Sequence, residues 1–559
     1  MKSTFITCGW PEQPPKQHNG RRANVLCGDT SLSLTQPSTC QVKNSYFARK
    51  CCAVSYCFLF IMTKPSRVSR ILLSTIFLGG LLLRVAFLLY GAKVYYGAAS
   101  IHDNGDSHSY MWAFENLWHT GYYTFDFLTP DAAFGRLPGY SFFYGLHYLV
   151  WGPKLAVAAT AWTQVLLDSC GSLLMFGILR RLFPTAYAGP LLGALLYAFY
   201  PFTIIWLPMM GTEALSTTLT LLWLYYLLGF RPTAVYALGL GLLLAVLFYV
   251  REYLGILVPI SVLHLLTHRG LSRQLAWRSA VLLGLGFGML YAWWPVRNYV
   301  LHQRVILTKP KTAGYASYGA DMDDFRSWVQ CWTNDENPWI GQVLGTGTVV
   351  FPAEVFANAQ EQANAQRLVR LTRQCGFSFY LTRTVMLYQP EYRDTLAMRR
   401  HAEYQARKRG NCASQISVGF TQLRRSYQQR HPVAYFFQVP LQNLSKAFFK
   451  SNTARANMEP VTGKMIAMRL LFGYRSLLVL LGVAGLLVFR HRRGLWPVAL
   501  FFGFMYLFIS FIMRGLEMRY LIQADAVLLV PAAALLGLGL DALLRRMSFL
   551  PVAPMPEVP

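Results

Sequence analysis

The chain is poor in acidic residues, and the loops on one side of its apolar segments contain none. It has 25 Asp and Glu against 52 Lys and Arg, with a formal net charge of +27. Lys and Arg favour the cytoplasmic loops of membrane proteins, so this asymmetry predicts an orientation. The basic residues are spread over many loops, which argues against a nucleic-acid-binding patch. The acids lie in loops of the opposite polarity, and we expect the chemistry on that face.

Three further absences narrow the function. No Gly-rich phosphate loop follows a strand, which argues against nucleotide chemistry. No internal repeat is present, whereas many transporters are built from repeated halves. The cysteines that precede Met62 match no zinc-ligand spacing. We interpret residues 1–61 as a non-native or disordered upstream extension, because Met62 begins a natural membrane-protein start.

Long uncharged apolar runs recur over the rest of the chain. A helix needs about 20 such residues to cross a bilayer core of about 30 Å. Ten runs of this kind are too many for the core of a soluble protein, so the sequence predicts an all-α polytopic membrane protein. The predicted spans are 71–90, 155–179, 187–207, 212–230, 233–250, 253–267, 279–296, 466–489, 495–513 and 520–543.

These spans divide the chain into parts. We expect a transmembrane module at 62–296 with an outward loop at 91–154. An outward, mostly helical soluble segment follows at 297–465, then spans eight to ten at 466–546 and a cytoplasmic tail at 547–559. Of three outward cysteines, two can form a disulfide and at least one stays unpaired. Those cysteines are Cys331, Cys375 and Cys412.

Shorter elements are expected in both outward parts. Ser107 predicts the N-cap of a helix that ends at Gly121. The apolar run 139–151 is too short to span and is expected at the membrane interface. The outer segment contains an Asp-x-Asp at Asp321 to Asp324, which we interpret as a solvated turn. Its predicted helices are 355–374, 390–409 and 417–430.

Ionisable residues collect at the outer ends of the predicted spans. Any one of them alone is a solvated end, but several at one depth predict a shared cavity. Arginine binds phosphate through a fixed fork of donors, and a carboxylate can take a proton from an attacking hydroxyl. The pairing suits transfer from a phosphate-linked donor to an alcohol. The residues are Asp103, Asp106, Glu213, Arg251, Glu252, Arg297, Glu517, Arg519 and Asp525.

Some of these residues have simpler interpretations. Asp106 can be a helix cap, and Glu252 can form a local ion pair with its neighbour Arg251. Asp168 lies deep in a span and needs a polar partner, for which Gln164 and a neighbouring helix are candidates. No cofactor is firmly expected, although imidazole and carboxylate groups in the first outer loop could hold a divalent metal. Those groups are His102, Asp103, Asp106 and His108.

The first outer loop also carries a family resemblance. Asp106-Ser-His-Ser-Tyr110, followed by Asn116-Leu117 and Gly121-Tyr122, resembles that of GT-C integral-membrane glycosyltransferases. The most similar groups are the protein mannosyltransferases, lipid A aminoarabinose transferases and rhizobial lipopolysaccharide transferases. Later motifs follow in the family's order, and together they cover about 62–546. They are Arg136-Leu-Pro-Gly-Tyr140, Tyr200-Pro201 with Thr212-Glu213, Trp294-Pro-Val-Arg297-Asn298-Tyr299 and Glu517-Met-Arg519-Tyr520.

The resemblance implies a GT-C-type bundle of about ten transmembrane helices, a polyprenyl-phosphate sugar donor and an extracytoplasmic active site. Asp106 would be the catalytic base. The family often has a second acid directly after it, where this chain has Ser107, so Asp103 or Glu213 could take the second role. The donor phosphate would be held by Arg297, Arg519 and Arg251. Supporting residues would be Tyr110, Arg136, Asn298, Glu517 and Tyr520.

The expected function is therefore an inverting sugar transfer to an acceptor at the outer face of the cell (inner) membrane. The acceptor is an unknown lipid, glycan or protein of the envelope, and membrane lipids are the other expected partners. A transporter or flippase is one alternative. A glycan ligase or polymerase is another, because the segment 297–465 is large enough to hold a long chain.

Overall fold

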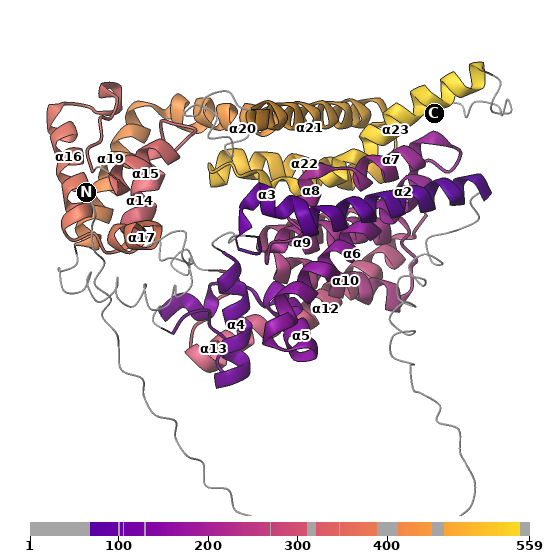
Figure 1. The fold of residues 1–559 in the computed structure, drawn as a ribbon, viewed down its shortest axis with the longest axis horizontal. Helices are drawn as coiled ribbons and strands as arrows, with labels where there is room; N and C mark the ends of the chain where they lie inside the picture. The colour runs from indigo at the N-terminus through magenta and orange to yellow at the C-terminus, as the bar shows by residue number, and fades with distance from the viewer. Residues whose placement is uncertain are drawn as a thin grey trace, which may run out of the picture. The chain divides into compact units, whose positions relative to one another are not determined.

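The computed structural model describes residues 67–98, 101–103, 106–127, 130–268, 270–309, 320–345, 347–387, 412–449 and 463–547. Every regular element in these ranges is a helix (Figure 1). The predicted extension at 1–61 and the predicted helix at 390–409 lie outside the described residues. Within the described part, the chain is an all-helical protein.

Six of the helices are long and apolar enough to cross a membrane, which indicates an integral membrane protein. The other predicted spans correspond to shorter helices: α7 (Ala188–Ala198) with α8 (Pro201–Ile204), α9 (Thr212–Leu228), α10 (Ala234–Val250), and η4 (Glu252–Ile256) with α11 (Leu257–Leu266). The count of ten spans therefore stays a prediction. The six long helices are Arg67–Tyr96, Pro153–Leu182, Arg273–His302, Ile466–Val488, Arg493–Met513 and Ile522–Arg546.

Several of these long helices combine consecutive elements. The first joins α2 (Arg67–Ala86), η1 (Phe87–Gly91) and α3 (Ala92–Tyr96), and the second is α6 (Pro153–Leu182). The third joins α12 (Arg273–Tyr291) and α13 (Trp293–His302), so it runs beyond the end predicted at residue 296. The remaining elements are α21 (Gly463–Val488), η9 (Arg493–Leu495), α22 (Trp496–Leu507), η10 (Phe508–Met513) and α23 (Ile522–Arg546).

Glycine lets some of these helices approach closely. A Cβ atom at Gly241 of α10 would lie 2.1 Å from the carbonyl oxygen of Leu283 on α12. A Cβ atom at Gly286 of α12 would lie 2.3 Å from the carbonyl oxygen of Leu238. α21 and α23 also run side by side (Figure 1). Small residues at such contacts are typical of helices packed within a membrane.

Two ion pairs are buried among the long helices. Asp168 accepts hydrogen bonds from Arg84 at 2.7 Å and from Tyr197 at 2.6 Å. The prediction of a polar partner from a neighbouring helix is therefore confirmed, but Gln164, the other candidate, instead donates to two backbone carbonyls. Asp525, expected at the rim of the cavity, is buried and pairs with Arg475 at 2.7 Å. Burial removes water from these charges, so each needs a close partner.

The segment 297–465, which we predicted to face outward and call the outer segment, has its own core, centred on aromatic side chains such as Trp328, Phe325 and Phe420. A disulfide joins Cys375 to Cys412, and Cys331 is buried and free, which agrees with the prediction that one disulfide is possible and at least one of these cysteines stays unpaired. Its helices are α14 (Ala320–Val329), α15 (Asn337–Leu344), η6 (Ala353–Val355), α16 (Ala359–Gln374), α17 (Phe377–Leu387), α19 (Ala413–Arg430), η8 (Ala434–Gln438) and α20 (Val439–Phe449).

The Asp-x-Asp motif is not the solvated turn that we predicted. It lies in helix α14, where Asp321 is buried and accepts a hydrogen bond from the backbone N–H of Ser378. Asp324 accepts a hydrogen bond from the hydroxyl of Ser417 on α19. These carboxylates hold helices of the outer segment together.

Candidate functional site

The candidate site begins at the first turn of α4 (Ser107–Thr120). The helix ends at Thr120 and is followed by Gly121, which adopts the left-handed conformation with φ 75°, so the predicted C-terminal end is confirmed. Asp106, rather than Ser107, occupies the N-cap position, and its side chain makes no capping hydrogen bond. The Asp106 carboxylate points instead toward two arginines, which outcompete the helix N-terminus as partners.

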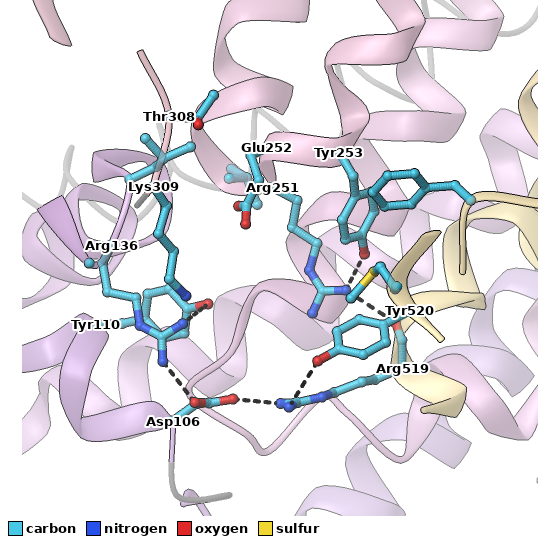
Figure 2. A pocket seen from close by; sticks show the side chains of 15 residues that line it. Asp106, Tyr110, Arg136, Arg251, Glu252, Tyr253, Thr308, Lys309, Arg519 and Tyr520 are labelled. Carbon is cyan, nitrogen blue, oxygen red and sulfur yellow. Dashed lines mark hydrogen bonds and ion pairs between the residues drawn. The ribbon is translucent and has the colours of Figure 1, made fainter. Parts of the chain in front are cut away.

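Asp106 is held between those arginines. Arg136 donates from Nη2 to Asp106 Oδ1 at 2.7 Å, and Arg519 donates from Nη1 to Asp106 Oδ2 at 2.7 Å (Figure 2). Burial alone would raise the pKa of the Asp106 carboxyl, but the two positive charges and their hydrogen bonds outweigh burial and hold that pKa well below its usual range. Asp106 is therefore ionised, and its side chain is 31% exposed.

Arg136 is itself fixed by α4. Its Nε donates to Ser109 Oγ at 2.7 Å, and its Nη1 donates to Tyr110 Oη at 3.2 Å. The guanidinium also lies 4.3 Å from the centre of the Tyr110 ring, a cation–π contact. Arg136 stands between η3 (Pro130–Phe134) and α5 (Pro138–Trp151), so these contacts tie the chain before α5 to α4.

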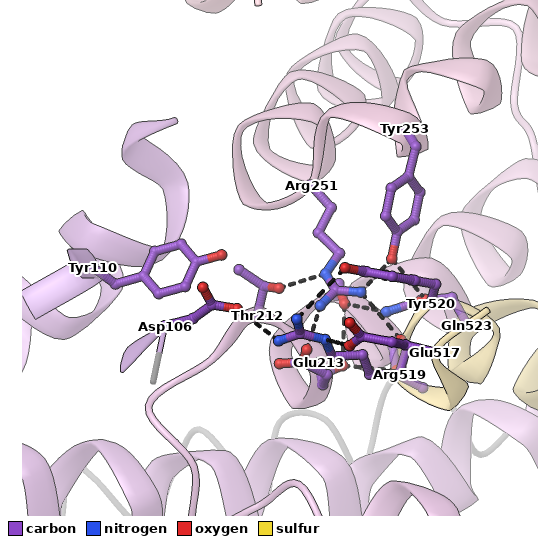
Figure 3. Close-up of polar contacts among 12 residues, drawn as sticks. Asp106, Tyr110, Thr212, Glu213, Arg251, Tyr253, Glu517, Arg519, Tyr520 and Gln523 are labelled. Carbon is purple, nitrogen blue, oxygen red and sulfur yellow. Dashed lines mark hydrogen bonds and ion pairs between the residues drawn. The ribbon is translucent and has the colours of Figure 1, made fainter. Parts of the chain in front are cut away.

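A second cluster surrounds Arg251 at the C-terminal end of α10 (Figure 3). Arg251 pairs with Glu213, in the first turn of α9, and donates to Thr212 and Tyr253. It also donates to the backbone carbonyl of Arg519 at 3.1 Å. Because the Arg519 side chain binds Asp106, residue 519 connects the two clusters.

The segment around Arg519 is short and well tethered. Arg519 lies in η11 (Met518–Tyr520), between the last two long helices. Its Nε donates to Glu517, and its Nη2 lies 3.5 Å from Tyr520 Oη. Glu517 and Tyr520 thus hold the side chain of Arg519, which binds Asp106 although the two residues are 413 positions apart in sequence.

The two clusters border a cavity of about 480 Å³, which Lys309 also lines. Figure 2 shows the Lys309 side chain extending toward Tyr110. Burial lowers the pKa of the Lys309 ammonium, and the positive charges of Arg136 and Arg519 add to this effect. The cavity is lined by Asp106, Tyr110, Gly135, Arg136, Leu137, Val250, Arg251, Glu252, Tyr253, Thr308, Lys309, Phe508, Met513, Arg519 and Tyr520.

Glu252 does not form the local ion pair with Arg251 that was one interpretation of their adjacency. Arg251 pairs with Glu213, and the Glu252 side chain is exposed at the cavity. Among the described residues, neither Glu252 nor Lys309 forms a side-chain hydrogen bond or ion pair. The Lys309 ammonium and the Glu252 carboxylate at the cavity are therefore available to a ligand.

Arg297 and Asn298 are not brought to the cavity. Arg297 donates to the backbone carbonyls of Ala133 and Tyr123 at 3.0 and 2.8 Å, and to the side-chain oxygen of Asn298 at 2.7 Å. Asn298 donates to the Ile306 carbonyl at 3.0 Å. These hydrogen bonds fix the loop before α5. Because Arg297 does not line the cavity, we no longer propose it as a ligand of the donor phosphate.

Two other acids predicted at the site have partners of their own. Asp103 lies 3.1 Å from His108 Nε2, and Glu213 is buried against Arg251. His102 Nδ1 contacts the Pro208 carbonyl at 2.7 Å. In the described ranges, no group of three or more His, Cys, Asp or Glu side chains is arranged to hold a metal ion. Of the four loop residues that we considered as metal ligands, Asp103 and His108 are in contact with each other.

The sequence reasoning missed Lys309, Tyr253 and Thr308, all of which line the cavity. Lys309 and Thr308 follow α13 in a stretch with no motif, so only the fold could show that they line the same cavity as Asp106. Tyr253 directly follows Arg251 and Glu252, both of which the sequence analysis placed at the expected cavity. Its contact with Arg251 gives it a place in the second cluster.

Comparisons of the chain with protein-family models, curated proteins and solved structures found no match. The interpretation of the cavity therefore depends on its own geometry and on the motif resemblance.

Proposed function

We propose that the protein is a GT-C-type glycosyltransferase with about ten spans. It would transfer a sugar from a polyprenyl-phosphate donor to an envelope acceptor on the extracytoplasmic face of the cell membrane. The observation that carries the proposal is the clamp on Asp106. Residues 106, 136 and 519, which come from remote parts of the chain, meet at a cavity that also holds Lys309.

The charge of the cavity suits a phosphate group. Its lining includes four cations, Arg136, Arg251, Lys309 and Arg519, against the two acids Asp106 and Glu252. The phosphodiester of a polyprenyl-phosphate sugar carries one negative charge. Arginine forks and an ammonium group would bind that charge and stabilise the phosphate as it leaves.

The transfer step follows from these groups. An acceptor hydroxyl would attack the anomeric carbon as the bond between that carbon and the phosphate oxygen breaks. The bonding electrons leave with the lipid phosphate, and the hydroxyl proton passes to a cavity carboxylate, Asp106 or Glu252. A single displacement of this kind inverts the anomeric centre.

Asp106 is a weak base while two arginines hold it, because its pKa is low. A donor phosphate would compete for the same guanidinium donors and would draw Arg519 or Arg136 away from the carboxylate. Asp106 would then lose part of the positive field and become more basic when the donor is bound. Donor binding and activation of the acceptor would thus be coupled through the shared arginines.

Two further observations support this proposal over the alternatives. The disulfide between Cys375 and Cys412 is expected in an oxidising compartment, which agrees with an extracytoplasmic outer segment. A transporter usually keeps available ionisable groups near the membrane midplane. Here Arg84 is engaged by Asp168 and by the backbone carbonyls of Gly80 and Ala198.

The test is a transfer assay with the full chain in lipid nanodiscs, labelled polyprenyl-phosphate sugars and extracted envelope acceptors. Asp106→Asn should lower the rate by about 100-fold or more, because general-base contributions are of that order. Asp131→Asn is the matched control, since Asp131 lies in the same outer loop and pairs with Arg304 outside the cavity. An Asp106→Asn variant as fast as wild type would refute the assignment.

A further inference from the structure

A second cavity, of about 470 Å³, lies at the other ends of two helices that reach the candidate site. The η4–α11 unit borders the first cavity through Tyr253 and the second through Ile260 and the residues that follow it. The α22–η10 helix borders the first through Phe508 and the second through Trp496. Because a helix is a rigid rod, the two cavities lie at opposite ends of the helical bundle.

The second cavity is lined by basic side chains. Arg181 comes from the last turn of α6, and Arg492 and Arg493 come from the turn before α22. His264 and His268 add two imidazoles from the end of α11. None of the described residues that line it is acidic, so three guanidinium groups face the space without a carboxylate among its walls.

Much of the hydrogen-bonding capacity of these arginines is free. Arg492 makes no side-chain hydrogen bond within the described part of the chain, and its guanidinium lies 5.9 Å from the Phe183 ring. Arg493 makes one long hydrogen bond of 3.4 Å, to the Thr267 carbonyl. Both side chains are exposed, so their free donors are open to an anion in the cavity, which a guanidinium binds through charge-assisted hydrogen bonds.

Arg181 is positioned more firmly. It donates to the Tyr225 carbonyl, and its guanidinium stacks 3.5 Å from the centre of the Tyr225 ring. Gly229 makes room for it, since a Cβ atom there would lie 2.0 Å from Arg181 Nη1. The guanidinium plane is thus fixed at the wall of the cavity, with its remaining donors available.

The rim of the same cavity is apolar and exposed. Trp496 is 53% exposed, and Leu263 and Leu500 are each 42% exposed. In a helical membrane protein such side chains face lipid, and Trp favours the level of the headgroups. The cavity therefore combines an anion-binding wall with a rim suited to acyl chains.

We propose that this cavity binds the phosphate of an anionic membrane phospholipid, whose acyl chains lie against Trp496 and the neighbouring leucines. Arg181, Arg492 and Arg493 bind the phosphate oxygens. Basic pockets between transmembrane helices are suited to such headgroups. The site is separate from the cavity around Asp106 and does not depend on sugar transfer.

Native mass spectrometry of the full-length protein in neutral detergent tests this with phosphatidylglycerol, phosphatidylcholine and inorganic phosphate as separate probes. Wild type should retain phosphatidylglycerol in preference to phosphatidylcholine. The double variant Arg492→Gln, Arg493→Gln should weaken that binding by about tenfold or more, because charge-assisted hydrogen bonds are lost. The control is Arg490→Gln, which removes an exposed arginine of the same turn that donates to His491 and does not line the cavity.

The single variant Arg492→Gln carries the test if the double variant fails to fold, because the Arg492 side chain makes no hydrogen bond within the described structure. Equal phosphatidylglycerol binding by wild type and the Arg492 variants would overturn the proposal. Equal binding of phosphatidylcholine would overturn it too, since a net negative charge would then not matter. Inorganic phosphate that bound as tightly as phosphatidylglycerol would identify a free-phosphate site and reject the lipid.

Discussion

Arginine–carboxylate pairs occur in two settings in this protein, deep among the helices and at the edge of a cavity. Arg84 and Asp168 are both 0% exposed, and Arg84 also binds backbone carbonyls. Asp106 is 31% exposed, and two arginines share it beside an uncommitted lysine. The saturated pair has no capacity for a ligand, whereas the shared carboxylate can exchange partners. We therefore propose a structural role for the first and a catalytic role for the second.

The largest expected effect comes from breaking the buried pair. Arg84→Gln leaves Asp168 charged and without its guanidinium partner inside the bundle. The free energy of unfolding should fall by about 3–5 kcal/mol, the usual loss when one member of a buried ion pair is removed. Thermal unfolding in detergent measures this loss, and the transfer rate per folded molecule should stay near that of wild type. A variant of normal stability would show that the pair is dispensable.

Removal of Arg519 should lower the transfer rate more than the stability, the opposite of the result expected for Arg84. Arg519→Gln removes one clamp on Asp106 and one proposed phosphate ligand, so the transfer rate should fall by about 100-fold. Its stability should change less than that of the Arg84 variant, because the Arg519 side chain is 19% exposed. Arg519→Lys should recover only part of the rate, since lysine keeps the charge but lacks the fork. Full activity in Arg519→Gln would separate this residue from the chemistry.

Lys309 gives a smaller effect with a pH signature. Lys309→Gln should weaken donor binding by about tenfold, the loss expected for one charged hydrogen bond. Because burial lowers the pKa of Lys309, its positive charge is present below that pKa and is lost as pH rises through it. As pH rises, donor binding should therefore begin to weaken at a pH below the ordinary lysine pKa of about 10.4. In Lys309→Arg this decline should move to higher pH, and an unchanged pH profile would exclude Lys309.

The smallest effect is expected at the partly exposed pair between Asp131 of the loop 91–154 and Arg304, which follows α13. Arg304 lies 2.6 Å from Asp131, and its side chain is 51% exposed. Arg304→Gln should change the free energy of unfolding by less than about 1 kcal/mol, because water screens such pairs. The transfer rate should stay at the wild-type level. A large loss of stability here would show that exposure does not separate the two settings.

The helical character of the chain and the first outer helix could be predicted, because apolar runs and helix-capping residues can be recognised from neighbouring positions in the sequence. Ser107 and Gly121 mark both ends of α4 in the sequence. The convergence of Asp106, Arg136, Arg251 and Arg519 was expected only from their depth at span ends and from the order of the motifs. The structure supplies their contacts, in which Arg519 connects the two clusters.

Other features depend on tertiary contacts that no local pattern contains. Asp168 was expected to find a polar partner in Gln164 or on a neighbouring helix, but the sequence did not identify Arg84, which is 84 positions away. Arg297 matches a motif as well as Arg519 does, yet its donors are taken up by carbonyls of the loop before α5. Lys309 matches no motif and reaches the cavity because the chain folds back after α13.

The most direct measurement compares Asp106→Asn with Asp168→Asn, recording the transfer rate and the unfolding temperature of each variant. The account predicts that Asp106→Asn loses most of its rate at a nearly unchanged unfolding temperature. Asp168→Asn should lose stability while its folded fraction keeps the wild-type rate. If both variants lost stability alone, or if Asp106→Asn kept its rate, the distinction between a structural and a catalytic carboxylate would be contradicted.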